Sequence, residues 1–338
     1  MNRRTVILSC SMLLSVVSSS VFATDGGSAY SFLNNTSSSH IYSLGGVNVS
    51  LVDEDIASTD QNPALLGPEF AGQLSVNYMK YVGESNFAGA RYGIKGGERS
   101  AWSVGFQYFG YGEMKGADIT GNPTGSFSAK DMFVSLAYSH DITDRLRGGI
   151  MLKGIYSAYD EYSAFALASD LGLNYYDEEK DMSLSLVLAN VGGQIKRFNE
   201  SYDRLPIDVR IGWSQSLSEL PLRLSVTAWN LTKWHLPYYD SGDGTQSSET
   251  KKKDSFGSNL FRHLIFGVEY IPSERFFIGL GYNYKTRTDM ATYQRNFLSG
   301  FSIGGGINVK RFGIGFAMSQ PHTGATTFMV NISTRIFE

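Results

Sequence analysis

Short segments in which apolar residues alternate with small or polar ones recur from about residue 72 to residue 337. In the segment 312–319, for example, Phe312, Ile314 and Phe316 alternate with Gly313 and Gly315. Successive side chains of a strand point to opposite faces, so each segment has one apolar and one polar face. Fourteen segments follow this pattern, and most have about ten residues, the length of a tilted strand that crosses a bilayer. They are 72–81, 86–95, 100–110, 127–140, 146–157, 163–176, 182–190, 207–216, 222–231, 263–271, 276–285, 298–309, 312–319 and 326–337.

The connections between these segments are unequal in a regular way. Even-numbered connections are short, such as 96–99 and 310–311, whereas odd-numbered ones tend to be long, with 232–262 the longest. A soluble β-sandwich, the main alternative, has no reason to place long loops on every second connection. Outer-membrane barrels have short periplasmic turns and longer extracellular loops. The sequence therefore predicts an all-β fold, a 14-stranded antiparallel transmembrane β-barrel, with both termini periplasmic and the long loops extracellular.

The first 23 residues have the features of a secretory signal peptide. Arg3 and Arg4 precede an apolar stretch, and Ala23 is a plausible cleavage point. The alternative, a membrane anchor, is disfavoured by the six serines in this stretch. Cys10 is the only cysteine, so the mature chain is expected to hold no disulfide, thiolate metal ligand or cysteine nucleophile. A net charge of -3 argues against nucleic acid as a partner.

Residues 24–71 precede the first strand segment and are too long to be a strand cap. They are rich in Gly, Ser and Asn, and the Asn62-Pro63 step interrupts regular structure. Many inward positions of the predicted barrel are Gly or Ala, which leaves room in the lumen. We therefore expect 24–71 to be an N-terminal plug or leader of the barrel at 72–338. Its candidate contact residues are Asn62, Pro63 and Leu65, and a plugged barrel is not a diffusion porin.

No constellation of residues indicates catalysis, a metal or a cofactor. None of the five histidines stands at metal-binding spacing to another, and no Gly-x-Ser-x-Gly motif occurs. His235 near Asp240 and Asp243 is the only acid–histidine cluster in a loop. A non-enzymatic protein without cofactors is therefore expected. The loop 232–262 holds the candidate partner-binding residues, whose lysines suit lipopolysaccharide or a protein, unless they are a solvated tip. These are Trp234, His235, Tyr238, Tyr239, Lys251, Lys252 and Lys253.

Several segments resemble a known family. The start Tyr-Ser-Phe-Leu-Asn at 30–34, Leu-Gly-Gly at 44–46 and Asn-Pro-Ala at 62–64 resemble the PorQ family of type IX secretion system subunits. The elements at 62–64 and 190–192 also fit the wider fatty-acid-transporter-like barrels, which include PorV. Further segments that carry the resemblance are 125–131, 168–173 and 188–192.

The resemblance implies a fourteen-stranded barrel in the outer membrane of a Bacteroidota-type bacterium. It implies a subunit of the cell-surface attachment complex that anchors surface proteins without chemistry of its own. The implied partners are a PorZ-like surface protein, a PorU-like sortase and a PorV-like barrel, besides outer-membrane lipid and lipopolysaccharide. The alternative is a transporter of hydrophobic molecules. That function needs an apolar path through the lumen, and the inward Gly, Ser, Asn and Asp residues predict a polar one.

Overall fold

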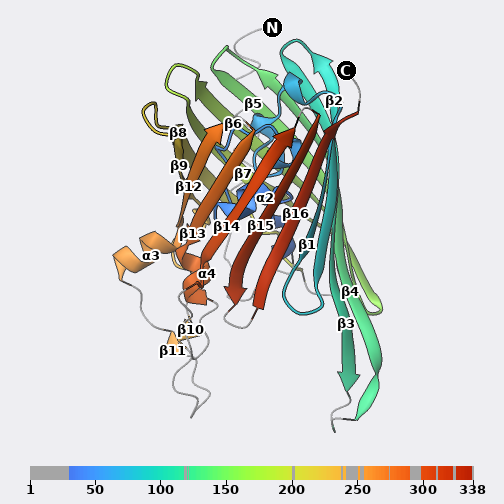
Figure 1. The fold of residues 1–338 in the computed structure, drawn as a ribbon. Coiled ribbons are helices and arrows are strands. Elements are labelled where there is room, and N and C mark those ends of the chain that lie inside the picture. Colours follow the sequence, from blue (N-terminus) through green and yellow to red (C-terminus); the bar gives the residue numbers. More distant parts are fainter. Residues whose placement is uncertain are drawn as a thin grey trace, which may run out of the picture.

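The computed structural model describes residues 30–117, 120, 122–199, 202–236, 239–240, 250–251, 255–273, 275–289, 298–309, 311–322 and 325–336. Fourteen strands form one closed barrel, and every neighbouring pair is antiparallel (Figure 1). The barrel strands are β1 (Gln73–Lys80), β2 (Asn86–Gly97), β3 (Ser100–Ala117), β4 (Pro123–Asp141), β5 (Leu146–Tyr159), β6 (Tyr162–Asp177), β7 (Met182–Lys196), β8 (Asp208–Ser216), β9 (Leu222–Ala228), β12 (Leu264–Ser273), β13 (Phe276–Asn283), β14 (Phe301–Val309), β15 (Phe312–His322) and β16 (Ala325–Arg335). The described helices are all too short or too polar to cross a bilayer.

Each of the fourteen predicted segments coincides with one barrel strand, so the predicted fold is confirmed. The barrel closes where β1 pairs with β16, from Gln73 opposite Arg335 to Lys80 opposite Phe328. Gln73 and Arg335 thus lie at the same end of the barrel, together with the short connections such as the one from β4 to β5. We call this end the turn end and the opposite one the loop end. Figure 1 shows the turn end at the top.

The two faces of the wall differ as the alternation predicts. On β3, Val104 and Phe106 are 40% and 43% exposed, whereas Ser103 before them and Gln107 after them are buried. The same pattern of apolar residues outside and small or polar ones inside recurs on β4, β6, β7 and β16. An apolar outer surface on a closed barrel is the arrangement that contacts lipid.

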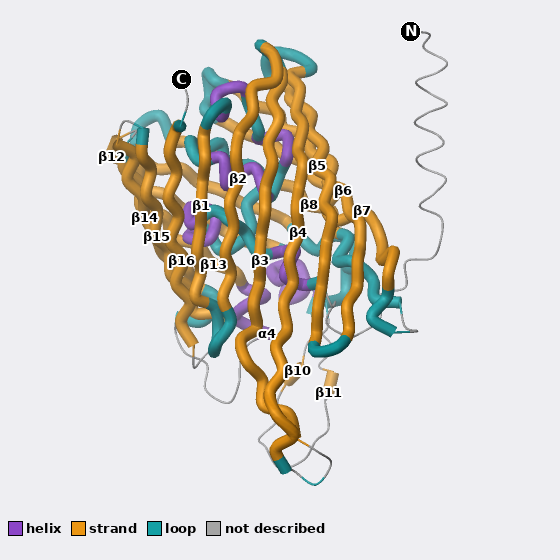
Figure 2. The backbone as a smooth tube through the Cα atoms, turned by 90° about the vertical axis from the view of Figure 1, so that its right-hand side faces the viewer, coloured by secondary structure: helices purple, strands orange, loops and turns teal. Residues whose placement is uncertain are grey.

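The wall is of unequal height at the loop end. The connection 111–126, which the sequence predicts to be a loop, is mostly strand, because β3 and β4 stay paired from Glu113 opposite Ser128 to Ala117 opposite Pro123. This two-stranded ribbon extends beyond the rest of the barrel (Figure 2). In contrast, β9 ends at Ala228 and is only 7 residues long. The barrel therefore has one high and one low side.

Residues 30–72 run through the inside of the barrel, from the loop end to the turn end (Figure 1, blue). At the loop end the Tyr30 hydroxyl accepts a hydrogen bond from Gln194 of β7. The segment consists of short helical turns, three of which begin with a side chain that caps them. Ser38 accepts from the Ile41 amide, Asp55 from the Ala57 amide and Asn62 from the Ala64 amide. Its elements are η2 (Ser31–Asn34), α2 (Ser39–Ser43), η3 (Ile56–Asp60), η4 (Pro63–Leu65) and η5 (Pro68–Phe70).

Candidate functional site: the filled lumen

Glycines in the wall let the backbone of residues 30–72, which we call the inner segment, lie directly against the strands. A Cβ on Gly281 of β13 would overlap the backbone of Leu44 and Gly45, and one on Gly149 of β5 would overlap Pro63. The Asn62 amide donates to the Val49 carbonyl at 2.8 Å and to the Ser185 hydroxyl of β7 at 3.1 Å. Among the predicted plug contacts, Asn62 and Pro63 thus touch the wall, and Leu65 is buried.

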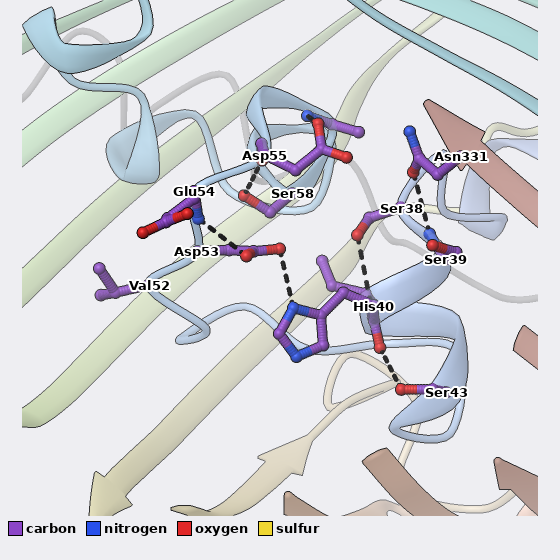
Figure 3. Close-up of polar contacts among 12 residues, drawn as sticks. Ser38, Ser39, His40, Ser43, Val52, Asp53, Glu54, Asp55, Ser58 and Asn331 are labelled. Atoms are coloured by element: carbon purple, nitrogen blue, oxygen red, sulfur yellow. Dashed lines mark hydrogen bonds and ion pairs between the residues drawn. The ribbon is translucent and has the colours of Figure 1, made fainter. Parts of the chain in front are cut away.

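A charged cluster joins the inner segment to the wall in the turn half of the lumen. The His40 ring of α2 has Nδ1 3.0 Å from Asp53 Oδ2 and Nε2 2.5 Å from Glu269 Oε1 of β12. Figure 3 shows the ring pointing at Asp53. Arg223 of β9 donates to both oxygens of Glu269 at 2.8 Å. The same ring stacks on Phe277 at a centroid distance of 3.6 Å, so His40 is fixed on three sides.

The protonation of this cluster follows from its neighbours. Burial alone would lower the His40 pKa, but the charges of Asp53 and Glu269 outweigh it and raise the pKa to about 9. For Asp53, burial would raise the pKa, yet His40 and Arg223 lower it below the ordinary value. At neutral pH the cluster therefore holds a protonated imidazole between two carboxylates.

Two more polar clusters hold the inner segment nearer the middle of the lumen. Asp60 of η3 accepts from Arg91 of β2, from Gln107 of β3 and from Ser37. On the far side, Arg210 of β8 donates to Gln61 at 2.9 Å and to Asn34 at 2.7 Å. Charged groups from strands on opposite sides of the barrel thus bind the same short stretch. Such clusters give a fixed position to a segment that has little regular structure of its own.

Part of the loop half of the lumen is apolar, which corrects the expectation that small and polar residues line the lumen. The inward side chains of six strands form one buried cluster, which we call the aromatic chamber: Met79, Phe87, Phe109, Phe133, Ile155 and Met329. Tyr30, Phe32 and Leu33 of the inner segment pack into this cluster, with the Phe32 and Phe133 rings 6.2 Å apart. The sequence signal is the strand parity, since Phe109 lies on the same face as Gln107, two residues away.

Polar groups at the border of the aromatic chamber are satisfied within the protein. Asp131 of β4 accepts from the hydroxyls of Tyr111 at 2.6 Å and Tyr159 at 2.8 Å. Lys153 of β5 lies 2.6 Å from Asp170 of β6 and 5.6 Å from the centre of the Phe133 ring. The chamber is therefore an apolar cluster of side chains with a few fixed polar groups at its edge, the usual composition of the walls of a site for a small hydrophobic molecule.

The predicted loop residues do not form one described site. The Trp234 ring stacks on His263 at 5.2 Å, and His235 is exposed. The backbones of Tyr239 and Lys251 pair in a small hairpin of β10 (Tyr239–Asp240) and β11 (Thr250–Lys251). Tyr238, Lys252 and Lys253 lie outside the described residues, so partner binding by this loop stays a prediction. Within the described ranges, no three His, Cys, Asp or Glu side chains are grouped as a metal site requires.

Comparison with known proteins identifies the fold. No family model matches the chain, and no curated protein is significantly similar in sequence. The toluene transporter TodX of Pseudomonas putida matches with a TM-score of 0.54 and 11% identity, over 94% of this chain and 100% of its own. A FadL homologue of Pseudomonas aeruginosa has a TM-score of 0.51 and 11% identity, over 89% and 99%. The monoaromatic hydrocarbon channel CymD has 0.52 and 10%, over 90% and 97%.

These likenesses define the class of the protein: its fold is that of a FadL-like outer-membrane β-barrel. Two of the three named structures are a transporter and a channel by name, and the third is named as a FadL homologue. They agree with the barrel fold that the sequence predicts. They give no support to the PorQ family or to a type IX secretion complex in particular.

Proposed function

We propose that this protein takes up small hydrophobic molecules at the outer membrane and that the aromatic chamber is where they first bind. The observation that carries this proposal is the chamber itself, the largest of the apolar clusters inside the described part of the barrel. A barrel that served only as an anchor has no need for aromatic side chains in one half of its lumen. Solved barrels of the same fold named as hydrocarbon transporters or channels add support.

The position of η2 suggests how the chamber is reached. Tyr30, Phe32 and Leu33 fill the chamber from the loop end, and they are the part of the inner segment farthest along the chain from the barrel strands. The hydrogen bonds that join this turn to the wall include one from Gln194 to Tyr30 at 2.8 Å and one from Arg210 to Asn34 at 2.7 Å. A hydrophobic molecule that replaces Phe32 keeps the chamber dry, so the exchange costs little hydrophobic free energy.

The proposal is tested by uptake in cells. A host without its own transporters of this fold would express the protein, and uptake of radiolabelled toluene and of a long-chain fatty acid would be compared with that of an empty vector. We expect faster uptake of at least one of the two probes. Uptake of both probes at the rate of the empty vector, with the barrel correctly assembled, would contradict the proposal.

A matched pair of variants locates the binding site. Phe109→Ser places a hydroxyl in the aromatic chamber, whereas Val187→Ser does the same at an equally buried inward residue, in the cluster around Val49. Binding of a hydrophobic fluorescent probe to the purified protein should weaken in the first variant and stay unchanged in the second. Equal weakening in both would mean that the probe does not sit in the chamber.

A second function, the anchoring of surface proteins, is favoured by one observation. The ribbon formed by the ends of β3 and β4 extends beyond the barrel at the loop end, with Phe127 partly exposed on it (Figure 2). If the loop end faces the cell exterior, this ribbon suits a PorZ-like surface protein, beside a PorU-like sortase and a PorV-like barrel. Replacing residues 113–127 by a short turn should then release co-purifying proteins while the barrel still assembles. Unchanged co-purification would exclude the ribbon.

A further inference from the structure

Helix α3 (Phe256–Arg262) lies in the connection between β9 and β12. It exposes its apolar face and buries its polar face, the opposite of a surface helix in a soluble protein. Its exposed face carries Phe256, Leu260 and Phe261, which are 71%, 36% and 51% exposed. Its buried face carries Asn259 and Arg262, which are 4% and 0% exposed. A helix on the surface of a soluble protein buries its apolar face instead. The lipid-facing wall has the same arrangement, with apolar residues outside and polar ones inside.

The buried polar face of α3 is fixed by hydrogen bonds. The Asn259 amide donates to the Trp234 carbonyl at 2.5 Å, and Arg262 donates to the Leu236 carbonyl at 3.0 Å. His263, the C-cap, lies 3.0 Å from the same Trp234 carbonyl and 2.9 Å from that of Trp229. The helix is therefore held in one orientation by the segment 229–236. Rotation of the helix would break all these bonds, so the hydrogen bonds keep its apolar face exposed.

The apolar face of α3 is continuous with the lipid-facing wall. The Phe261 ring lies 6.3 Å from that of Phe266 on the outer face of β12, and 6.3 Å from that of Tyr284 at the start of α4 (Tyr284–Asp289). At the other end of the helix, Phe256 lies 5.7 Å from Trp234. Figure 1 shows α3 standing out from the side of the barrel, below β12. An unbroken apolar strip thus runs from the wall onto the helix.

The strand that leads into the α3 connection, β9, is too short to span the apolar part of a bilayer by itself. A strand rises about 3.3 Å per residue, and in a barrel it is tilted by about 35–45°. The 7 residues of β9 then span about 16–19 Å, whereas the apolar band of such barrels is about 25 Å tall. At β9 the band therefore extends past the loop-end terminus of the strand, and α3 lies in the connection that follows β9.

We propose that α3 is an interfacial helix whose Phe256–Leu260–Phe261 face is immersed in the outer leaflet of the membrane. Its occupant is lipid, because the face continues an existing lipid contact and the adjoining α4 carries Lys285 and Arg287, cations that suit anionic headgroups. Aromatic residues such as Trp234 and Tyr284 are also the types that collect at the level of the headgroups. The helix would complete the apolar band on the low side of the barrel.

The test measures whether α3 meets lipid or water. The chain has one cysteine, Cys10, so a nitroxide label can be attached to a single introduced cysteine in a Cys10→Ser background. Gly257→Cys puts the label on the exposed face of α3, where a side chain meets no neighbour within 4 Å. Val134→Cys, at a position 60% exposed on the lipid face of β4, is the lipid reference. Asp144→Cys, whose side chain is 95% exposed in a turn, is the water reference.

Each labelled protein would be reconstituted in vesicles of phosphatidylethanolamine and phosphatidylglycerol, and collisions with oxygen and with a water-soluble nickel chelate would be measured. We expect the label at 257 to prefer oxygen, with a depth between those of the two references. A label at 257 as accessible to nickel as the one at 144 would overturn the proposal. So would a label that is open to nickel in vesicles but shielded from both reagents in native outer membranes, because a protein partner would then cover the helix.

A second pair of variants distinguishes loss of the apolar face of α3 from failure of the barrel to assemble. Phe261→Asp should cause the label at 257 to lose its preference for oxygen, whereas Phe261→Leu should keep it. Assembly of both barrels is checked by their heat-modifiable mobility in gels. If Phe261→Asp does not assemble, Phe256→Ser gives the same comparison at the free end of the helix. Retention of the oxygen preference in an assembled Phe261→Asp or Phe256→Ser variant would also count against the immersed face.

Discussion

The Nε2 atom of His40 lies 2.5 Å from a carboxylate oxygen of Glu269, so a charged side chain of the inner segment meets one of the barrel wall inside the lumen. Both side chains are buried, at 5% and 0% exposure. A buried pair of this kind is favourable only while both partners are charged and hydrogen-bonded. The attachment of the inner segment to the wall is therefore coupled to the protonation of His40.

Attachment of the inner segment should weaken at alkaline pH. The His40 pKa is raised from 6.5 to about 9, so its stabilising contribution is complete below pH 6.5 and is lost as the pH rises through 9. That contribution is up to about 3 kcal/mol. Asp53, with a lowered pKa, contributes above its ordinary value of 3.8 and less under stronger acid. Hydrogen exchange of the amides of residues 39–53 should therefore be slowest, relative to the intrinsic rate, between about pH 4 and 6.5.

The control for this pH dependence is a histidine outside the lumen. His40→Gln should remove the change in protection between pH 6.5 and 9, whereas His140→Gln, at an exposed position on the wall, should leave it intact. An unchanged pH profile in His40→Gln would assign the dependence to another group.

Removing the Asp60 carboxylate should loosen the inner segment without opening the barrel. Asp60→Ala leaves Arg91 buried without its ion pair, and its side chain is only 3% exposed. Breaking such a buried pair costs about 3–5 kcal/mol. Protection of residues 53–66 against hydrogen exchange should fall by an amount of this order, while the barrel strands keep theirs. The exposed pair of Arg99 and Asp144 provides the comparison, since Asp144→Ala should cost less than about 1 kcal/mol.

Alanine substitutions at two glycines of β5 should have opposite effects on the inner segment. A Cβ at Gly149 overlaps the backbone of Pro63, whereas one at Gly154, five residues along β5, meets only side-chain atoms at 3.9 Å or more. Gly149→Ala should displace η4 at a cost of about 1–3 kcal/mol, and Gly154→Ala should be neutral. Protease sensitivity of the inner segment in assembled barrels distinguishes them. Equal resistance of both variants would show that η4 adapts without leaving the wall.

The strands could be predicted from the sequence because every strand of a lipid-facing wall has the same alternation of apolar and polar residues. Every outward residue meets the same apolar solvent, so alternation at Val104 and Phe106 or at Val330 and Ile332 needs no knowledge of the partner strand. The extension of β3 and β4 past Gly110 escaped prediction, because once a ribbon leaves the bilayer neither face must be apolar. The sequence therefore predicts a loop for segment 111–126.

The interior was harder to predict because its side chains meet different partners at each level. Phe87, Phe109 and Phe133 point inward by the same alternation as Ser103. The prediction of a polar lumen rested on the small inward residues and left these aromatic side chains out. The position of His40 depends on contacts with Glu269 and Phe277, more than two hundred residues away, and no local pattern encodes these contacts. In the same way, α3 is recognisable only when the wall beside it is known to be low.

A disulfide should show whether uptake requires the whole inner segment to move or only its first turn. An ideal Cβ at Gly315 of β15 lies 3.6 Å from the Cβ of Ser39 in α2, within the range of about 3.5–4.5 Å that a disulfide needs. Ser39→Cys with Gly315→Cys therefore should form a bond between α2 and the wall under oxidising conditions.

Because the proposed binding in the aromatic chamber displaces only η2, probe binding should be equal in the oxidised and reduced protein. If passage onward requires α2 to leave, uptake in cells should stop on oxidation and return with a reductant. The single variants, which cannot form the bond, should be insensitive to redox conditions. Probe binding that disappears on oxidation would show that the chamber opens only when the entire inner segment is released.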